Sequence, residues 1–174
     1  MADIMPGQSA LTPLGLDAKP APEDAPVRMV EYAHSGKILL RGDPGNDNFT
    51  TAVRGVLGMA PPPVPLSSAI VKGWVLLWLG PDEWLIACPA GEEKALFAEL
   101  GAALEPVHAA LVDLTDAQTI IRISGPRARN LIAKGCTLDL HPRSFGAGQV
   151  TRSTLAHAQI TLFQTASDDE AGGP

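Results

Sequence analysis

Residues 109–140, AALVDLTDAQTIIRISGPRARNLIAKGCTLDL, carry the clearest run of local structural signals in this chain. Segments 108–114 and 119–124 are short and rich in apolar and β-branched residues, which favours two strands separated by a turn. Gly125 and Pro126 then end the second strand, and proline suits the first position of a helix, where its missing N–H would have no partner. The stretch therefore predicts a strand, a turn, a strand and a helix in succession.

A short helix is predicted at 127–134, directly after this glycine–proline pair. Ala128, Leu131 and Ile132 follow the i, i+3, i+4 spacing of one helix face, so we expect that face to pack against the core. Gly135 is expected to end the helix in the left-handed conformation, which glycine adopts without steric cost.

The remaining sequence predicts an α+β fold in which antiparallel strands pack against helices. The further strands are expected at 27–32, 37–41, 73–79, 83–88, 149–155 and 159–163, and the further helices at 46–57 and 92–104. Strands 73–79 and 83–88 flank Gly80-Pro81-Asp82, which predicts a hairpin-like connection. Both strands are apolar almost throughout, so both faces of their sheet are expected to be covered.

Three tryptophans supply most of the aromatic bulk of the chain. Trp74 and Trp78 are four residues apart in a predicted strand, which places them on the same face. Trp84 lies in the next predicted strand. Packing in the core is the favoured interpretation of these side chains over a platform on which a ligand stacks.

The domain organisation is predicted from composition. Residues 1–26 are rich in proline and alanine and are expected to form a flexible arm, while 165–174 form an acidic tail. Between them, 27–164 form one α+β domain or two small lobes with a boundary near 89–108. The three leucines within 11–16 would anchor the arm across a partner, although a plain flexible arm is the favoured interpretation.

Composition and charge restrict the classes of partner. The chain has 174 residues, a formal net charge of −6 and a pI near 5.1, which argues against a nucleic-acid partner. Its longest apolar stretch, 74–79, is too short to span a bilayer. Residues 1–10 lack the basic and apolar regions of a signal peptide. We therefore expect a cytoplasmic protein that binds neither membrane nor nucleic acid.

Motifs for cofactors and metals are missing from the sequence. No glycine-rich phosphate loop follows a strand, and the four histidines show no metal-ligand spacing. Cys88 and Cys136 favour two reduced thiols over a disulfide. We expect no catalytic, cofactor-binding or metal-binding residue on this chain.

Two polar segments are candidates for chemistry, and the pair Asp113 and Asp116 is the stronger. Asp113 and Asp116 form a pair of carboxylates that could act as a general base, but aspartates at the end of a strand also accept hydrogen bonds from turn N–H groups. Asp139, His141 and Arg143 lie close together in the sequence, where a surface turn held by local hydrogen bonds is favoured over a functional cluster. We therefore expect that the chain alone does not catalyse a reaction.

A resemblance to a known family lies in residues 111–145, LVDLTDAQTIIRISGPRARNLIAKGCTLDLHPRSF. This segment resembles the central motif of the gamma subunit family of heterotetrameric sarcosine oxidase, and its most specific part is GCTLDLHPR at 135–143. The block LGPDEWL at 79–85 is similar to another family segment, so the resemblance extends over about residues 30–163. More distantly, the chain is similar to the aminomethyltransferase, or glycine-cleavage T-protein, family, in which Asp-Leu-Ser precedes a strand, Gly-Pro and a helix.

The resemblance implies an accessory, non-catalytic subunit that supports the large subunit of a sarcosine oxidase, with a fold similar to that of the T-protein. Such a complex oxidatively demethylates sarcosine to glycine and passes the one-carbon unit to tetrahydrofolate or releases formaldehyde. The implied cofactors of the complex are FAD, FMN, NAD and tetrahydrofolate, none of them on this chain, and the implied partners are the alpha, beta and delta subunits. The alternative is a free-standing folate-binding protein of the aminomethyltransferase type, which should be larger. The acidic residue that serves folate chemistry in that family has no matching motif here.

The C-terminus departs from the family pattern. Gamma subunits usually continue with a further strand and an amphipathic helix, whereas this sequence ends in TASDDEAGGP. We expect a truncated or divergent C-terminus that leaves strand 159–163 as an unprotected apolar edge. Because such an edge is a template for strand pairing, the isolated chain is expected to self-associate.

Overall fold

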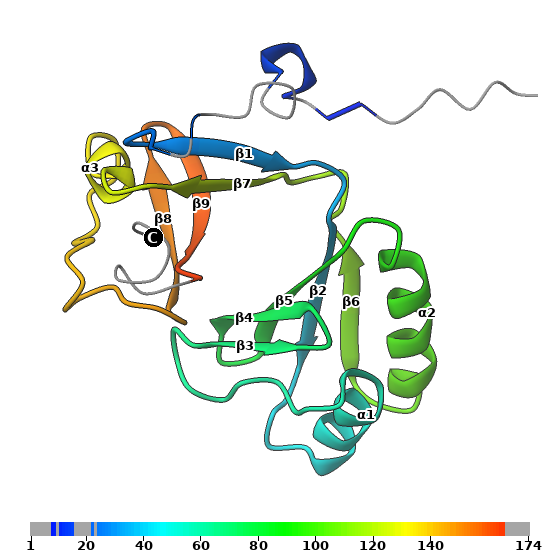
Figure 1. Ribbon diagram of the computed structural model, residues 1–174. Helices are drawn as coiled ribbons and strands as arrows, with labels where there is room; N and C mark the ends of the chain where they lie inside the picture. The colour runs from blue at the N-terminus through cyan, green and yellow to red at the C-terminus, as the bar shows by residue number, and fades with distance from the viewer. Residues whose placement is uncertain (1–7, 10, 16–21, 23, 166–174) are drawn as a thin grey trace, which may run out of the picture.

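The computed structural model describes residues 8–9, 11–15, 22 and 24–165 (Figure 1). Most of the expected arm at 1–26 and all of the expected tail beyond residue 165 lie outside the described residues. The described chain has a mixed α+β architecture in which every strand pairing is antiparallel, and this confirms the predicted fold class.

Strands outnumber helices in the described residues. In chain order the elements are η1 (Thr12–Leu14), β1 (Arg28–Tyr32), β2 (Gly36–Gly42), α1 (Asp47–Leu57), β3 (Ser68–Val71), β4 (Trp74–Gly80), β5 (Glu83–Cys88), α2 (Glu93–Leu104), β6 (Ala109–Asp113), β7 (Ile120–Ser124), α3 (Ala128–Ile132), β8 (Val150–Leu155) and β9 (Ala158–Phe163). Five strands form the main sheet in the order β3-β4-β5-β2-β6, while β1 pairs with β7 and β8 pairs with β9.

All the predicted strands and helices are present, and β3 is an additional strand. It occupies the edge of the main sheet and follows the proline-rich segment 60–65. Because proline also favours extended backbone, the sequence pattern did not distinguish a short strand here from a loop. Its connection to β4 is a two-residue turn in which Lys72 and Gly73 both have positive φ, at 53° and 86°. Such a turn matches the twist of an antiparallel hairpin.

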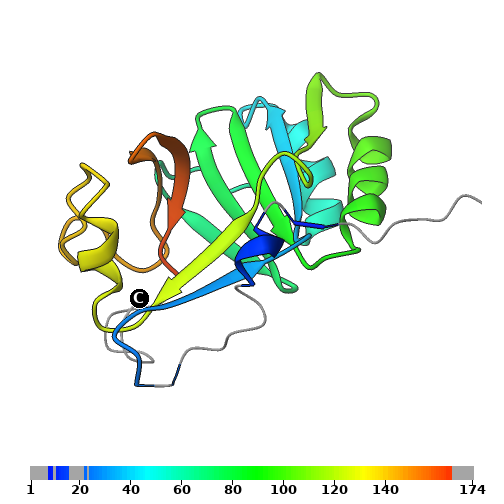
Figure 2. The same cartoon turned by 90° about the horizontal axis from the view of Figure 1, so that it is seen from above.

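Helices α1 and α2 cover one face of the main sheet, while β8, β9 and α3 lie on its other side (Figures 1 and 2). The larger core lies beneath the two helices, because alternate residues of β2, β4 and β5 point toward them. Its buried members are Ile38, Leu40, Phe49, Val53, Leu57, Leu76, Trp84, Ile86, Cys88, Leu96, Leu100 and Leu104. Trp84 is thus a core residue, and Trp74 and Trp78 pack at its margin, as expected.

The other face of the main sheet carries a second, smaller core. Leu77 of β4 and Leu85 of β5 are buried there with Val150, the first residue of β8. Two hydrogen bonds fix β8 beside the start of β3: Val150 N–H donates to the Leu66 carbonyl at 2.9 Å, and Ser68 Oγ donates to the Gly148 carbonyl at 2.7 Å. Both faces of β4 and β5 are therefore covered, as their continuous apolar sequences predict.

Helix α1 shows why the sequence predicts its limits well. Asn46 caps the start by accepting a hydrogen bond from the Asn48 N–H at 2.9 Å. Gly58 ends the helix with φ at 85° and donates its N–H to the Arg54 carbonyl at 2.8 Å. Between these caps, the apolar side chains Phe49, Val53 and Leu57 recur at every fourth position and pack in the main core.

The predicted strand–turn–strand unit at 108–124 is divided between two sheets. Strand β6 pairs with β2 in the main sheet, whereas β7 pairs with β1. Strands β1 and β2 are divided in the same way. The chain therefore passes between the β1–β7 ribbon and the main sheet in two crossings, one from β1 to β2 and one from β6 to β7. The crossings are joined where the Leu114 N–H donates to the Lys37 carbonyl at 2.8 Å. Pairing between distant strands therefore decides the topology.

Two predictions about α3 were wrong. Leu131 was expected to face the core, but it is 38% exposed, and Ala128 is the buried residue of this five-residue helix. Gly135 was expected to be left-handed, but it does not have positive φ. A Cβ added at Gly135 would lie 3.2 Å from Leu155 Cδ1, so the close approach of the β8–β9 hairpin accounts for glycine there.

Hydrogen bonds of the Arg129 side chain, and not a broad apolar face, attach α3 to the rest of the chain. Arg129 donates to the Gln164 side-chain oxygen at 2.7 Å and to the Phe145 carbonyl at 3.1 Å, and it also contacts the Leu140 carbonyl. These bonds attach α3 to the loop before β8 and to the residue after β9.

Strand β9 pairs with β8 along its whole length, from Val150↔Phe163 to Leu155↔Ala158. The expectation of an unprotected strand at 159–163 was therefore wrong for one of its two edges. Among the described residues, the other edge has no strand partner.

The packing predicts unequal costs for two truncations. Phe49 is fully buried, with its ring centroid 5.9 Å from that of Trp84, so Phe49→Ala should lower the free energy of unfolding by about 3–5 kcal/mol. Leu131→Ala is the matched control and should cost less than about 1 kcal/mol, because its side chain is partly in water. Urea denaturation of both variants tests this; equal costs would contradict the assignment of the core.

Candidate functional site

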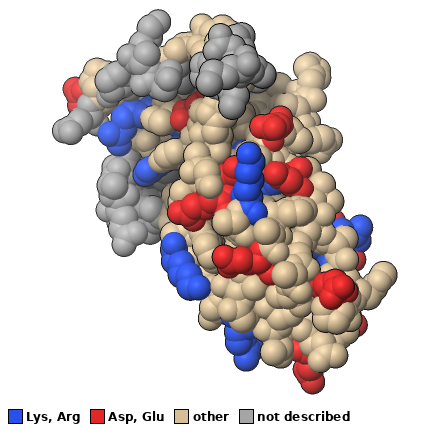
Figure 3. Space-filling model, turned by 90° about the vertical axis from the view of Figure 1, so that its right-hand side faces the viewer, with Lys and Arg blue, Asp and Glu red and all other residues tan. Residues whose placement is uncertain are grey.

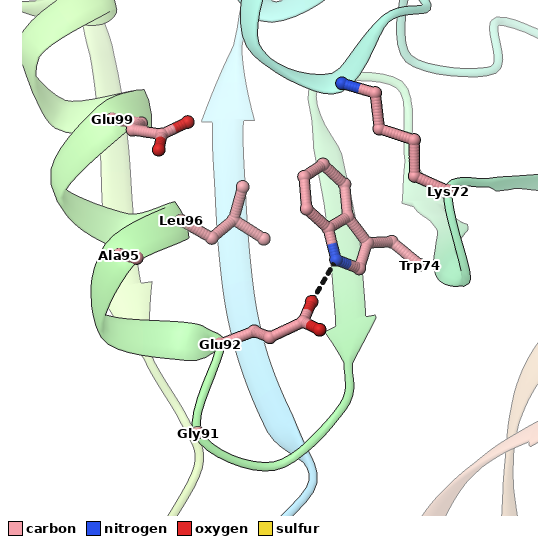
Figure 4. A pocket seen from close by; sticks show the side chains of 7 residues that line it. All are labelled: Lys72, Trp74, Gly91, Glu92, Ala95, Leu96 and Glu99. Carbon is pink, nitrogen blue, oxygen red and sulfur yellow. Dashed lines mark hydrogen bonds between the residues drawn. The ribbon is translucent and has the colours of Figure 1, made fainter.

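A surface hollow lies between α2 and the turn from β3 to β4 (Figure 4). It has a volume of about 470 Å³ and is lined by Lys72, Trp74, Gly91, Glu92, Ala95, Leu96 and Glu99. The turn supplies the lysine, the start of β4 supplies the tryptophan, and the first turns of α2 supply the carboxylates and the buried leucine.

Glu92 and Lys72 both interact with Trp74 in this hollow. Trp74 Nε1 donates to the Glu92 carboxylate at 2.6 Å, as Figure 4 shows. Lys72 Nζ lies 5.4 Å from the centre of the Trp74 ring, within range of a cation–π contact, and also donates to the Val56 carbonyl at 3.3 Å. The lining contains no histidine, cysteine or serine that could act as a nucleophile. The hollow is thus a weak candidate for catalysis.

Asp113, one of the two catalytic candidates, serves the turn that follows β6. Its carboxylate accepts the Thr115 N–H at 2.8 Å. Hydrogen bonds from the Thr115 side chain and N–H hold the pKa of Asp113 below its usual range, so this carboxylate stays ionised as a turn acceptor. Asp116 is exposed nearby, and no hydrogen bond between the two carboxylates is found in the described part of the chain. The structure thus gives Asp113 a structural role as the acceptor of its turn.

Lys37 is the buried charged side chain nearest to these aspartates, and the sequence analysis missed it. The residue is 1% exposed, and its Nζ donates to the Ser35 carbonyl. Burial lowers the pKa of Lys37, while Asp113 and Asp116 oppose that change by favouring the cation. A lysine directly before the apolar run Ile38-Leu39-Leu40 was the signal available, but Asp113 and Asp116 come from a distant segment.

The segment 139–144 is the surface turn that was predicted. Asp139 accepts the His141 N–H at 2.9 Å and the Ser144 hydroxyl at 2.6 Å, and His141 Nδ1 accepts the Arg143 N–H at 3.2 Å. The hydrogen bonds from the Ser144 hydroxyl and the His141 N–H lower the pKa of Asp139, and that from Ser144 has the larger effect. The cluster therefore has a local structural explanation.

Both cysteines are free and buried, which confirms the preference for thiols over a disulfide. Burial raises the pKa of Cys88 to about 11. Cys136 lies 3.4 Å from the Ser153 hydroxyl. Neither side chain has the exposed, cation-rich surroundings of a reactive thiol.

Metal ligands, membrane spans and charge patches were also considered. Within the described residues, no group of three or more His, Cys, Asp or Glu side chains is placed to hold a metal ion. Among the helices of the same residues, none has the length and apolar character that crossing a bilayer requires. On the face formed by α1 and α2, acidic and basic side chains are interspersed among broad uncharged areas (Figure 3).

Comparison with known proteins gives a family match over most of the chain. The model of the "Sarcosine oxidase, gamma subunit family" matches residues 41–171. The chain belongs to this family. The gamma subunit of sarcosine oxidase from Corynebacterium sp. (strain P-1) is 36% identical over 139 residues, which cover 80% of this chain and 68% of that protein.

Solved structures agree with this membership. A chain of the heterotetrameric sarcosine oxidase from Corynebacterium sp. U-96, in complex with pyrrole 2-carboxylate, has a TM-score of 0.76 and 31% identity, with 89% of this gamma subunit and 78% of that chain covered. Aminomethyltransferase T of the glycine cleavage system from Bartonella henselae has a TM-score of 0.58 and 16% identity, with 74% of this chain and 36% of that chain covered. The second likeness concerns the fold, and it confirms the distant resemblance to the T-protein fold.

The charge of Asp113 predicts a pH dependence of stability. Because its pKa is lowered in the folded state, the carboxylate stabilises the fold above its ordinary pKa of ~3.9, and this contribution is lost as pH falls through the lowered value. Asp113→Asn keeps an oxygen acceptor for Thr115 without the charge. It should therefore lower the free energy of unfolding at pH 7, and the difference from the unmodified chain should shrink at pH 3.

Urea denaturation at the two pH values measures this difference. Asp116→Asn is the matched control, because it removes an equal charge three residues away and should change the free energy by less than about 0.5 kcal/mol at pH 7. A difference for Asp113→Asn that is equal at pH 7 and pH 3 would show that the carboxylate charge does not stabilise the turn.

The Cys88 thiol should resist alkylation in the folded protein. A pKa of about 11 leaves roughly one thiolate in a thousand at pH 8, and the side chain is also buried. Iodoacetamide labelling followed by mass spectrometry should therefore be about 100-fold slower without urea than in urea. Equal rates in both conditions would mean that Cys88 is accessible.

Proposed function

We propose that this chain is the gamma subunit of a heterotetrameric sarcosine oxidase and that it supports the large subunit of that complex. The observation that carries the proposal is 36% identity over 139 residues to a gamma subunit of sarcosine oxidase. The likeness extends to a chain of a solved heterotetrameric complex at a TM-score of 0.76. The reaction of the complex would be the oxidative demethylation of sarcosine to glycine, with the one-carbon unit passed to tetrahydrofolate or released as formaldehyde.

The partners in this proposal are the alpha, beta and delta subunits, which would hold the FAD, FMN, NAD and tetrahydrofolate of the complex. The arrangement of polar groups on this chain supports that division of labour. In the surface hollow, the Trp74 indole donates a hydrogen bond to the Glu92 carboxylate. The carboxylates of Asp113 and Asp139 accept hydrogen bonds within turns. The two free thiols suit a reducing compartment, and we propose the cytoplasm.

The alternative is a free-standing folate-binding protein of the aminomethyltransferase type. The chain covers 36% of the solved T-protein chain to which it is similar. The identity to that chain is 16%, whereas it is 36% over 139 residues to a gamma subunit of sarcosine oxidase. We therefore favour the accessory subunit.

Co-expression with candidate alpha, beta and delta subunits tests the proposal. The four chains should elute together in size-exclusion chromatography in equal molar amounts, and the same three subunits expressed without this chain are the control. Elution of this chain apart from a complete three-subunit complex would contradict the proposal. Binding of tetrahydrofolate to the isolated chain in calorimetry would favour the alternative. The isolated chain is expected to self-associate, since β9 retains an edge without a strand partner among the described residues.

A further inference from the structure

The β1–β7 ribbon exposes apolar side chains on both of its faces. Met29, Val30, Tyr32 and Ile121 are between 39% and 43% exposed. Each strand pairs with one neighbour, so both outer edges lack a strand partner in the described residues. A two-stranded sheet is at best marginally stable alone in water. Another segment packed against either face of this ribbon would therefore stabilise it.

The register of the ribbon assigns its side chains to two faces. Directly opposed residues of an antiparallel pair share a face, and successive residues alternate between faces. The first face, which we name the arginine face, consists of Arg28, Val30, Tyr32, Ile120, Arg122 and Ser124. The opposite face carries Met29, Glu31, Ile121 and Ile123.

The arginine face has two cations and no carboxylate at its register positions. Arg122 donates to the Tyr32 hydroxyl at 3.4 Å, which confirms that these side chains lie on one side. Arg28 Nε is buried without a hydrogen-bond partner among the described residues. Because this nitrogen is inaccessible in the folded chain, a partner would meet the exposed members of this face, Val30, Tyr32 and Arg122, instead.

The one carboxylate of the ribbon is engaged on the opposite face. Glu31 accepts a hydrogen bond from the Thr119 hydroxyl at 2.7 Å and another from the Ser9 hydroxyl. Ser9 precedes η1, which lies beside the ribbon in both views of the fold (Figures 1 and 2). The described part of the arm thus meets the ribbon through Glu31, on the opposite face, while Val30, Tyr32 and Arg122 of the arginine face are exposed.

We propose that the arginine face is the docking surface for a carboxylate-bearing, partly apolar segment of the large partner subunit, an inference that rests on the proposed function. Charge complementarity selects this occupant, because two guanidinium groups stand beside exposed Val30 and Tyr32 on a chain whose net charge is −6. Arginine forms bidentate hydrogen bonds with carboxylates, and tyrosine and arginine are enriched in protein interfaces.

A second copy of the chain fits this face poorly. In a two-fold symmetric dimer the same patch meets itself, so the arginine pairs of the two copies would face each other without intervening carboxylates. Like charges brought together in an interface disfavour association. A segment that supplies carboxylates complements the charge of the two arginines.

A titration of the assembled partners tests the proposal. The alpha, beta and delta subunits are immobilised through a tag on the large subunit, and the purified gamma chain is titrated against them. Arg28→Glu/Arg122→Glu should weaken binding by about tenfold or more, since it places carboxylates against the acidic segment. Arg54→Glu/Lys94→Glu is the matched control, with the same charge change at exposed positions of α1 and α2, and should bind within about threefold of the unmodified chain.

Thermal melts establish that each variant is folded. If the charge-reversed variant does not fold, Arg28→Gln/Arg122→Gln replaces it and should bind more weakly and with a smaller dependence on salt, because the guanidinium charges are gone. Binding of the folded variants as tight as that of the unmodified chain would overturn the docking surface alone. Failure of the unmodified chain to bind would overturn the proposed function with it. Loss of self-association in the charge-reversed variant, with binding to the partners intact, would identify a second copy as the occupant and overturn the proposal.

Discussion

The main chain of Lys37 joins the two crossings on which the topology depends. Its N–H donates to the Thr115 hydroxyl at 3.1 Å, and its carbonyl accepts the Leu114 N–H at 2.8 Å. Lys37 follows the crossing from β1 to β2, and the other two residues begin the crossing from β6 to β7. Each hydrogen bond contributes about 0.5–1.5 kcal/mol. Their larger effect is geometric, because they keep β1 and β7 close enough to pair outside the main sheet.

The β8–β9 hairpin and α3 depend on attachments of a different kind. Val150 contributes the buried apolar contact between β8 and the second face of the main sheet, and its N–H bonds to the chain before β3. Arg129 then connects α3 with the loop before β8 and with Gln164 after β9. Since a five-residue helix buries little surface, these polar bonds replace the apolar stripe that the sequence suggested.

The sequence predicted the elements well and their partners poorly, and the difference has a physical cause. Caps such as Asn46 and Gly58 act on their own helix, so local residues are sufficient to place α1. The pairing of β6 with β2 depends on a strand about seventy residues away, which no local pattern reveals. The same limit applies to the surface hollow, where Trp74 and Glu92 meet from a strand and a helix. Asp113 could be predicted as a turn acceptor because Thr115 is its near neighbour.

The chain shares its fold with the T-protein, and the two carboxylates that the sequence offered for chemistry serve its own turns. Asp113 is bonded to Thr115, and Asp139 is bonded to Ser144. Hydrogen bonds to an ionised carboxylate lower its pKa and make it a weaker base. The exposed side chains of β1 and β7 lie where the fold leaves a sheet of two strands. In the proposed function these side chains make the contribution of the chain to the complex, while the polar groups of the turns serve its internal structure.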